Sequence, residues 1–348
     1  MSSIRICCAA ASLLLAVAAA VPAFGETVKE SQPLMGGIVD ISVESSDRDH
    51  GHELIREAVA AGQKLQSELA ADDESSDLSK LNAAAGLAPI AVPLDLYRLL
   101  ALSQLMTRST GSAFDVTIGP LVRNRRTISG SDHGPHFTFD QALSLVGADK
   151  IVLKSGKAGL AKAGMSVDVS AVERGYCLER MAAVLRKAGV TKALLQFDDT
   201  AVLAIGPPAG EPPFRIWIAR GKSMAGSLLL RDRSVATTRV RQRGNGSSSA
   251  PIVDPRSGRF VEADRQATVL ARDAAIAQAW STALVVDPDG ALGLLDEPRD
   301  VEAVTFDERG AHTSPHFIAE SQWVALAGAP DFPESDPVPP PQPPEERD

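Results

Sequence analysis

A stretch near the middle of the chain, residues 167–189, constrains the fold more than any other segment. It starts as a short alternating apolar piece, passes through a charged turn closed by Gly175, and continues as an amphipathic helix. Gly189 stands where a helix usually ends. Apolar residues at three- and four-residue spacing would form one buried stripe on this helix: Leu178, Met181, Ala182, Leu185 and Ala188.

The turn by itself leaves two interpretations open. Backbone N–H groups at the start of a helix can face an anion, so a glycine-containing strand-to-helix turn can form part of a ligand site. An ordinary connection between a sheet and a helix uses the same residue types. The rest of the chain has to decide between them.

The first 25 residues predict a cleavable signal peptide. Arg5 supplies a positive start, residues 6–21 are an apolar run rich in Leu and Ala, and Ala23 and Gly25 are small residues at cleavage-type spacing. An uncleaved membrane anchor is the alternative, but the run is short and Pro22 closes it. We therefore expect an exported protein.

Only one cysteine, Cys177, would remain after cleavage, so no internal disulfide can form. Its position near a helix start could lower its pKa, but a small buried residue is the favoured interpretation. Cleavage would remove Arg5 and none of the 44 acidic residues, which gives a formal charge of −10. With no basic stripe and 4% aromatic residues, nothing in the chain favours binding to nucleic acid.

The 348 residues, 44% of them hydrophobic, are enough for a sizeable core. Apolar periodicity predicts helices over residues 51–70, 94–107 and 274–286, the last with Asp273 as its N-cap. Residues 34–43 are expected to form a glycine turn that leads into a strand, and further strands are expected over residues 193–197, 215–219, 227–230 and 267–271. Loops are expected over residues 72–79, 123–126 and 241–249.

These elements predict a single α+β domain over residues 27–328, in which mixed or antiparallel sheet pieces pack with helices. No internal repeat is present. Residues 329–348 are rich in proline and acidic residues, and this composition is typical of a disordered tail.

Residues Ser112–Val122 (SAFDVTIGPLV) resemble the most recognisable motif of the FAD:protein FMN transferases, the ApbE-type flavin transferases. Further blocks in the same order are similar to other motifs of that family, and together they cover nearly the whole mature domain. These blocks are Met35–Gly37, Ser76–Asn82, Asp168–Tyr176, Ile252–Gly258 and Ala277–Ala283.

The resemblance implies an ApbE-like α+β fold and a periplasmic enzyme that binds FAD. With Mg²⁺, such an enzyme cleaves the pyrophosphate, transfers FMN to a Thr or Ser of a target flavoprotein and releases AMP; a membrane-associated target is compatible with this activity. Because this is phosphoryl-type transfer, catalysis would depend mostly on positioning and charge neutralisation.

The resemblance also implies site residues, although it assigns no catalytic side chain. Flavin-binding positions would be Met35, Ala113, Phe114, Asp115, Asp168, Arg174 and Ile252. Metal ligands would be the carbonyl of Ala171 and the side chains of Gln278 and Thr282. Plainer structural roles remain open for three of these residues: Asp115 and Asp168 as turn carboxylates, and Thr282 as a hydroxyl bonded back to its own helix.

Several positions depart from the family pattern. Gln278 replaces a metal-binding Asp, Ala250 replaces a His, and Asp198-Asp199 replaces a Gly-Gly pair. Arg174 replaces a Lys. Two functions from different classes therefore remain: an active FAD:protein FMN transferase, or a catalytically degenerate relative that binds flavin or a partner protein.

Overall fold

The computed structural model describes residues 25–128, 137–221, 223–240, 252–295 and 300–325. Apart from Gly25, the predicted signal peptide lies outside the described residues, as do the predicted loop over 241–249, Ala250 and the predicted tail over 329–348.

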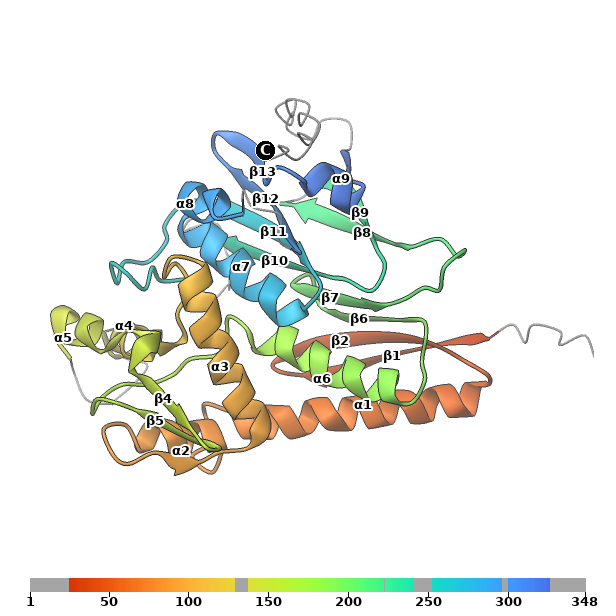
Figure 1. Cartoon of the computed structure of the whole chain (residues 1–348). Helices are drawn as coiled ribbons and strands as arrows, with labels where there is room; N and C mark the ends of the chain where they lie inside the picture. The colour runs from red at the N-terminus through yellow and green to blue at the C-terminus, as the bar shows by residue number, and fades with distance from the viewer. Residues whose placement is uncertain (1–24, 129–136, 222, 241–251, 296–299, 326–348) are drawn as a thin grey trace, which may run out of the picture.

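An eight-stranded sheet with only antiparallel pairings runs through the molecule (Figure 1). Its strand order is β1-β2-β6-β7-β10-β11-β12-β13. The strands are β1 (Glu26–Leu34), β2 (Gly37–Ser45), β6 (Ala193–Phe197), β7 (Ala201–Ile205), β10 (Ser234–Val240), β11 (Arg265–Ala271), β12 (Val301–Asp307) and β13 (Gly310–Thr313). The predicted α+β class with antiparallel sheet pieces is confirmed.

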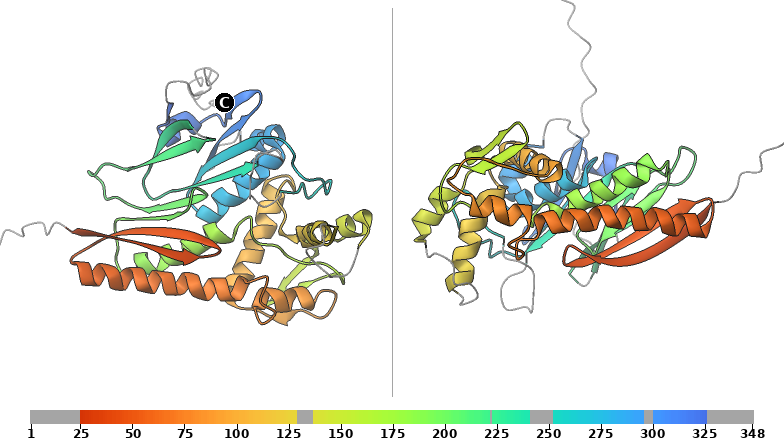
Figure 2. Two further views of the ribbon diagram at one scale, coloured as in Figure 1. Left: turned by 180° about the vertical axis from the view of Figure 1, so that it is seen from behind. Right: turned by 90° about the horizontal axis from the view of Figure 1, so that it is seen from below.

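Three helices cover one face of this sheet: α1 (Arg48–Leu69), α6 (Glu173–Lys187) and α7 (Ala274–Val286) (Figures 1 and 2). Alternate residues of β2, among them Val39 and Ile41, are buried against these helices, as the period of a strand requires. Helix α7 is apolar and buried on nearly all sides, which is typical of a helix at the centre of a core.

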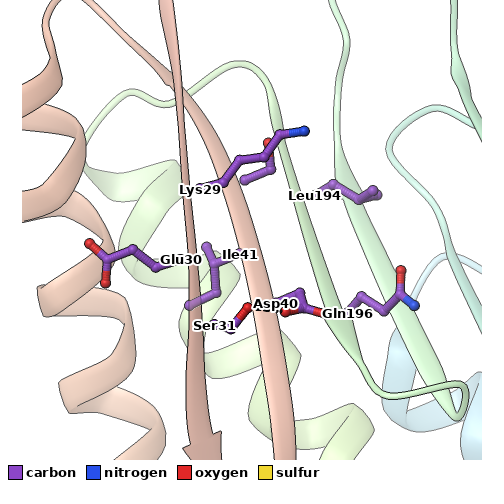
Figure 3. A pocket seen from close by; sticks show the side chains of 8 residues that line it. Lys29, Glu30, Ser31, Asp40, Ile41, Leu194 and Gln196 are labelled. Carbon is purple, nitrogen blue, oxygen red and sulfur yellow. Dashed lines mark hydrogen bonds between the residues drawn. The ribbon is translucent and has the colours of Figure 1, made fainter.

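The opposite face is covered only in part. A three-stranded sheet of β8 (Phe214–Arg220), β9 (Ser223–Leu230) and β14 (Val324–Ala325) packs on the half formed by the later strands and makes a second apolar core. The outer face of β1, β2 and β6 carries an open hollow of about 320 Å³ (Figure 3). Figure 3 shows Glu30 turned toward α1, where it meets His52, and away from Asp40 and Gln196.

A smaller lobe lies beside the helical layer (Figure 1). Its helices are α2 (Asp77–Ala83), α3 (Leu94–Ser109), α4 (Gly119–Ile128) and α5 (Phe139–Leu145), with the short helical turns η1 (Val116–Ile118) and η2 (Ala148–Lys150). Its sheet is β3 (Ile90–Ala91), β5 (Lys157–Leu160) and β4 (Ile151–Lys154). The short helices α8 (Pro288–Gly293) and α9 (Phe317–Ser321) lie near the C-terminal end of the described chain.

The predicted helix over the central stretch is confirmed, with corrections at both ends. It starts at Glu173, so Gly175 lies in the first helical turn and does not close the turn before it. Ala188 is the exposed C-cap, outside the buried stripe, because the helix has already ended there. Gly189 follows with φ +84°, as expected for a glycine that stops a helix.

Two predicted loops are partly helical. Residues 123–126 belong to α4, and α2 starts at Asp77, inside the predicted loop 72–79. Ser76 caps α2 by accepting the N–H of Ser79 at 3.0 Å. Apolar periodicity did not predict these two helices, because a short, largely solvated helix carries few apolar side chains.

Asp273 stands at the N-cap of α7 as predicted, but its side chain makes no capping hydrogen bond. The Ala274 N–H donates instead to Glu179 Oε1 of α6, at 2.6 Å. A side chain from another helix thus satisfies an N–H that the helix itself leaves without a partner. Burial of Glu179 raises the pKa of its carboxyl to about 7, although the Ala274 hydrogen bond opposes the shift.

Replacement of Glu179 by glutamine is expected to flatten the pH dependence of stability. The folded protein keeps a proton on Glu179 up to about pH 7, whereas the unfolded chain loses it near pH 4.5. The contribution of Glu179 to stability is therefore fully present below pH 4.5 and is lost as the pH rises to 7, a loss of about 3 kcal/mol. Urea unfolding of the wild type and of Glu179→Gln at pH 5 and pH 8 measures this dependence. An equal loss of unfolding free energy between the two pH values in both proteins would contradict the prediction. The glutamine can still accept the Ala274 N–H.

The thiol of Cys177 is fully buried, and burial raises its pKa to about 12. The favoured prediction of a small buried residue is therefore confirmed, and burial disfavours the reactive thiolate form. In the part of the chain that the structure describes, no helix is both long and apolar enough to cross a membrane.

Candidate functional site

Motif blocks that are far apart in the sequence meet at the turn before α6. The side chain of Asn82 donates to the carbonyl of Val167 at 3.1 Å and accepts the N–H of the same residue at 2.7 Å. The next N–H, that of Asp168, donates to the carbonyl of Val116 at 2.7 Å. Blocks 76–82 and 112–122 therefore hold the backbone of this turn from two sides.

Asp115 acts as an internal cap in this structure. Its Oδ1 accepts the N–H and the hydroxyl of Thr117 at 2.8 and 2.6 Å, and its Oδ2 accepts the N–H of Ala148 at 2.8 Å. Burial raises the pKa of this carboxyl, although the three hydrogen bonds oppose the shift. The neighbouring side chains of Ala113 and Phe114 lie in the core. The predicted flavin-binding motif thus fixes the shape of the loop around it.

Arg174 points from the start of α6 toward two turns of the main sheet. Its Nη2 donates to the carbonyl of Met35 at 3.3 Å, and its Nη1 donates to Asp198 Oδ2 at 3.4 Å. The guanidinium also lies over the ring of Phe197, 5.9 Å from its centre. The structure therefore brings two predicted flavin-binding residues, Met35 and Arg174, into direct contact.

Met35 is the first residue of the two-residue turn between β1 and β2, and its N–H donates to Gln66 Oε1 of α1 at 2.6 Å. Met35 and Gly36 both have positive φ, as a type I′ hairpin turn requires. A hydrogen bond from α1 therefore fixes a turn that a methionine would not favour by itself. Nothing in the local sequence pointed to Gln66.

Two further acidic groups, those of Glu173 and Asp168, lie near Arg174. Burial of Glu173 and the nearby charge of Asp168 raise the pKa of Glu173 to about 7, against the opposing effect of Arg174. Asp168 itself accepts the N–H of Ser170 at 3.0 Å, which is a turn contact. Asp168 is partly buried, so a carboxylate and a guanidinium both border the same turn.

The predicted metal ligands come from two elements. Gln278 of α7 is almost fully buried, and its Oε1 accepts the N–H of Gly175 at 2.7 Å. The Thr282 hydroxyl is 3.5 Å from that of Thr238, which makes a shorter contact of 2.7 Å with Ser281. Ala171 is partly buried in the turn before α6.

This donor set fits a divalent cation poorly. A carbonyl, an amide and a hydroxyl bring no negative charge, and the amide oxygen of Gln278 already accepts a backbone N–H. No group of three or more His, Cys, Asp or Glu side chains that could hold a metal is found within the described ranges. The residues at these three positions therefore do not fit the metal site that the resemblance implies.

The loop with Ile252 makes its polar contacts elsewhere. Arg256 donates to Asp254 Oδ1 at 3.0 Å and to Asp287 Oδ2 at 2.7 Å, which ties the loop to the junction of α7 and α8. Ile252 is partly buried against the main core. The structure thus places this predicted flavin-binding residue in a loop whose ion pairs run to the end of α7.

A family model described as "ApbE family" matches residues 35–305. The chain belongs to the ApbE family. The match contains all six motif blocks, from the turn at Met35 to α7, so the residues that meet at the start of α6 lie inside the family domain.

Curated relatives carry the name FAD:protein FMN transferase. One from Klebsiella pneumoniae is 27% identical over 242 residues, which cover 66% of this chain and 74% of the relative. One from Salmonella typhimurium is 26% identical over 314 residues, 82% of this chain and 87% of the relative.

Solved structures share the fold of this ApbE-family protein. The flavin transferase ApbE from Vibrio cholerae matches with a TM-score of 0.72 at 20% identity and covers 85% of this chain and 99% of that one. The apo form of the flavinyl transferase ApbE from Pseudomonas stutzeri matches with a TM-score of 0.69 at 21% identity, over 83% and 95% of the two chains. The single α+β domain is thus a known architecture.

Proposed function

We propose that this protein is a FAD:protein FMN transferase that acts on a Thr or Ser of a target flavoprotein. Membership of the ApbE family and the names of its curated relatives support the activity. The single observation that carries the proposal for this chain is that Met35, Arg174 and the turn at Asp168 meet at the start of α6. A guanidinium at a helix N-terminus suits the pyrophosphate of FAD.

The proposed reaction is a phosphoryl-type transfer. The hydroxyl oxygen of the acceptor forms a bond to the phosphorus of the FMN half, and the bond from that phosphorus to the bridging oxygen of the pyrophosphate breaks. AMP leaves with the bridging oxygen, and the hydroxyl proton passes to AMP or water. The part assigned to this chain is to position the FAD and to neutralise its charge through Arg174.

The family resemblance implies that the transfer requires Mg²⁺. The predicted metal ligands of this chain are all neutral, so they should bind Mg²⁺ weakly. Without a carboxylate, any activity should need a high Mg²⁺ concentration. Gln278 is the position at which a single substitution supplies the missing charge.

Substitution of Gln278 by aspartate is expected to lower the Mg²⁺ concentration for half-maximal transfer by about tenfold or more, because a carboxylate is a stronger ligand for a hard cation than an amide. Gln278→Asn is the matched control, since the asparagine side chain has the length of aspartate but no charge. Thermal unfolding at increasing Mg²⁺ provides a second readout, in which only the aspartate variant should gain stability. Equal Mg²⁺ requirements in the two variants would contradict the prediction.

A second function is favoured by specific contacts. Gln278 is occupied by the Gly175 N–H and Arg174 by Asp198, as expected of a degenerate relative that binds flavin or a partner without transferring FMN. Mixing the protein with FAD, Mg²⁺ and an acceptor domain separates the two functions. FAD binding without covalent FMN on the acceptor would favour the degenerate relative.

We also propose that the chain is exported to the periplasm, on the basis of the signal-peptide pattern of its first 25 residues. A target flavoprotein in the same compartment, including one bound to the membrane, would then be accessible. N-terminal sequencing of the protein from a periplasmic extract should give a start near Glu26. An intact N-terminus in the membrane fraction would contradict export by cleavage.

A further inference from the structure

Arg174, the cation that the proposed function assigns to the phosphate groups, is paired in this structure. Its guanidinium donates to the carboxylate of Asp198 at 3.4 Å and to the carbonyl of Met35 at 3.3 Å. About a quarter of the Arg174 side chain and two fifths of the Asp198 side chain are exposed, 24% and 39%. A ligand that approaches Arg174 from solvent therefore meets the carboxylate at the same place.

Backbone contacts hold Asp198 independently of Arg174. Its Oδ1 accepts the N–H of Ile38 at 3.2 Å, and its own N–H donates to the Ile38 carbonyl at 3.1 Å. The side chain of Gln196 donates to the Asp198 carbonyl at 2.7 Å. Asp198 has φ +41°, a conformation that aspartate tolerates better than most residues. The carboxylate is thus held at the turn between β6 and β7 by contacts that do not involve Arg174.

Gly37 provides the space for this arrangement. A Cβ built at Gly37 would lie 2.5 Å from Asp198 Oδ2 and 3.1 Å from Arg174 Nη2. Any side chain at this position would push the carboxylate or the guanidinium aside. The ion pair therefore depends on three residues from three elements: Gly37 in β2, Arg174 in α6 and Asp198 in the β6–β7 turn.

The adjacent aspartate has a similar partner. Asp199 Oδ2 lies 3.5 Å from Arg239 Nη1, and Arg239 also donates to Gln266 and to the carbonyl of Ala219. The two consecutive aspartates thus pair with two different arginines. Two arginines that could bind phosphate groups are both partly neutralised.

We infer that Asp198 is a built-in competitor for phosphate groups at Arg174 and sets the affinity of the site for phosphate-bearing ligands. This inference rests on the proposed function, because the phosphate groups in question are those of FAD. A phosphate that binds Arg174 must break the ion pair and then stands beside a carboxylate of the same charge. The isoalloxazine part of the ligand carries no such charge. Asp198 should therefore weaken the binding of flavins that carry phosphate groups and leave the binding of flavins without phosphate unchanged.

Equilibrium binding of FAD and of riboflavin, followed by flavin fluorescence, tests the inference. Asp198→Asn keeps the oxygen that accepts the Ile38 N–H and removes the charge, so the Kd for FAD should fall about three- to fivefold at low salt. Riboflavin has no phosphate, and its Kd should stay within about twofold.

Two further variants make the result specific. Asp40→Asn removes the same charge from the outer face of β2, where the carboxylate contacts Ser31, and should leave the Kd for FAD unchanged. In the background of Arg174→Gln, Asp198→Asn should improve FAD binding by less than it does in the wild type, because no ion pair has to be broken. Equal Kd values for FAD in the wild type and Asp198→Asn would overturn the inference, and so would an equal gain with riboflavin.

Inorganic pyrophosphate separates failure of this inference from failure of the proposed function. If no variant binds FAD or riboflavin, the flavin function is wrong, and pyrophosphate binding measured by calorimetry then decides on Asp198. Tighter pyrophosphate binding by Asp198→Asn would support the competitor role without flavin. Equal or undetectable pyrophosphate binding in both proteins would overturn it.

Discussion

Replacement of Gly175 by alanine is expected to lower the free energy of unfolding by about 3 kcal/mol or more, because overpacking between two backbones has no cheap relaxation. A Cβ at this position would lie 2.4 Å from the carbonyl oxygen of Ala274 and 2.6 Å from its carbonyl carbon. Helices α6 and α7 would have to move apart. That movement would also stretch the hydrogen bond from Gly175 to Gln278.

Urea unfolding at constant pH measures this loss. Gly293→Ala is the matched control, since Gly293 lies in helix α8 and no atom comes within 4 Å of a Cβ built there. That variant should be unchanged or slightly more stable, by up to about 1 kcal/mol, because alanine favours a helix. A Gly175→Ala protein as stable as the Gly293→Ala control would show that the two helices do not cross at this closeness.

Substitution of Asp115 by alanine is the second change with a large expected effect. It leaves three donors without their partner: two N–H groups and the hydroxyl of Thr117. Since each unsatisfied buried donor costs about 1–3 kcal/mol and some regain water, we expect a loss of about 3–4 kcal/mol. Asp115→Asn keeps one acceptor oxygen and should lose about half as much. Thermal or urea unfolding gives both values.

Asp115→Asn also decides between the two roles considered for Asp115. If the carboxylate only caps the loop, Asp115→Asn should bind FAD within about twofold of the wild type under conditions in which both are fully folded. If the carboxylate contacts flavin directly, FAD affinity should fall while the protein stays folded. The contacts in the structure favour the first result, because both carboxylate oxygens already accept internal hydrogen bonds.

Much of the fold follows from local sequence patterns. The positive-φ Gly189 just after the end of α6, the helix from Ala274 to Val286 and the strand from Ala193 to Phe197 are all as predicted. Each depends on residues within a few positions of itself: a glycine that adopts positive φ, or an apolar run of fixed length. The strands β7, β10 and β12 were not predicted. A strand in the middle of a sheet can be a short run of apolar or hydroxyl residues, and such a run has no distinct periodicity.

The features that the sequence did not reveal are contacts between distant segments. Glu179 caps a helix that begins 95 residues later, and Asn82 holds a turn 85 residues away. Asp198 was recognised as a departure from the family pattern, but its partner Arg174 and the space left by Gly37 became visible only in three dimensions. Periodicity and capping rules depend only on residues that are close in sequence, so they cannot predict contacts between distant segments.

The candidate site was located by resemblance and not by chemistry. No single motif had the spacing of a catalytic triad or a metal centre, and the six motif blocks became meaningful as a set. The structure gives several of them a shared physical role, since blocks 76–82 and 112–122 both hold the backbone of the turn before α6. Where the chain departs from the family, at Gln278 and Asp198, the replaced side chains have found internal partners.

The most direct test of the proposed function is the intact mass of an acceptor flavoprotein domain after incubation with this protein, FAD and Mg²⁺. We expect the acceptor to gain the mass of one FMN unit at its Thr or Ser, with an equal amount of AMP released, and replacement of that residue by Ala to abolish both. An unchanged acceptor mass with the wild type, with Gln278→Asp and with Asp198→Asn at saturating FAD and high Mg²⁺ would contradict the transferase.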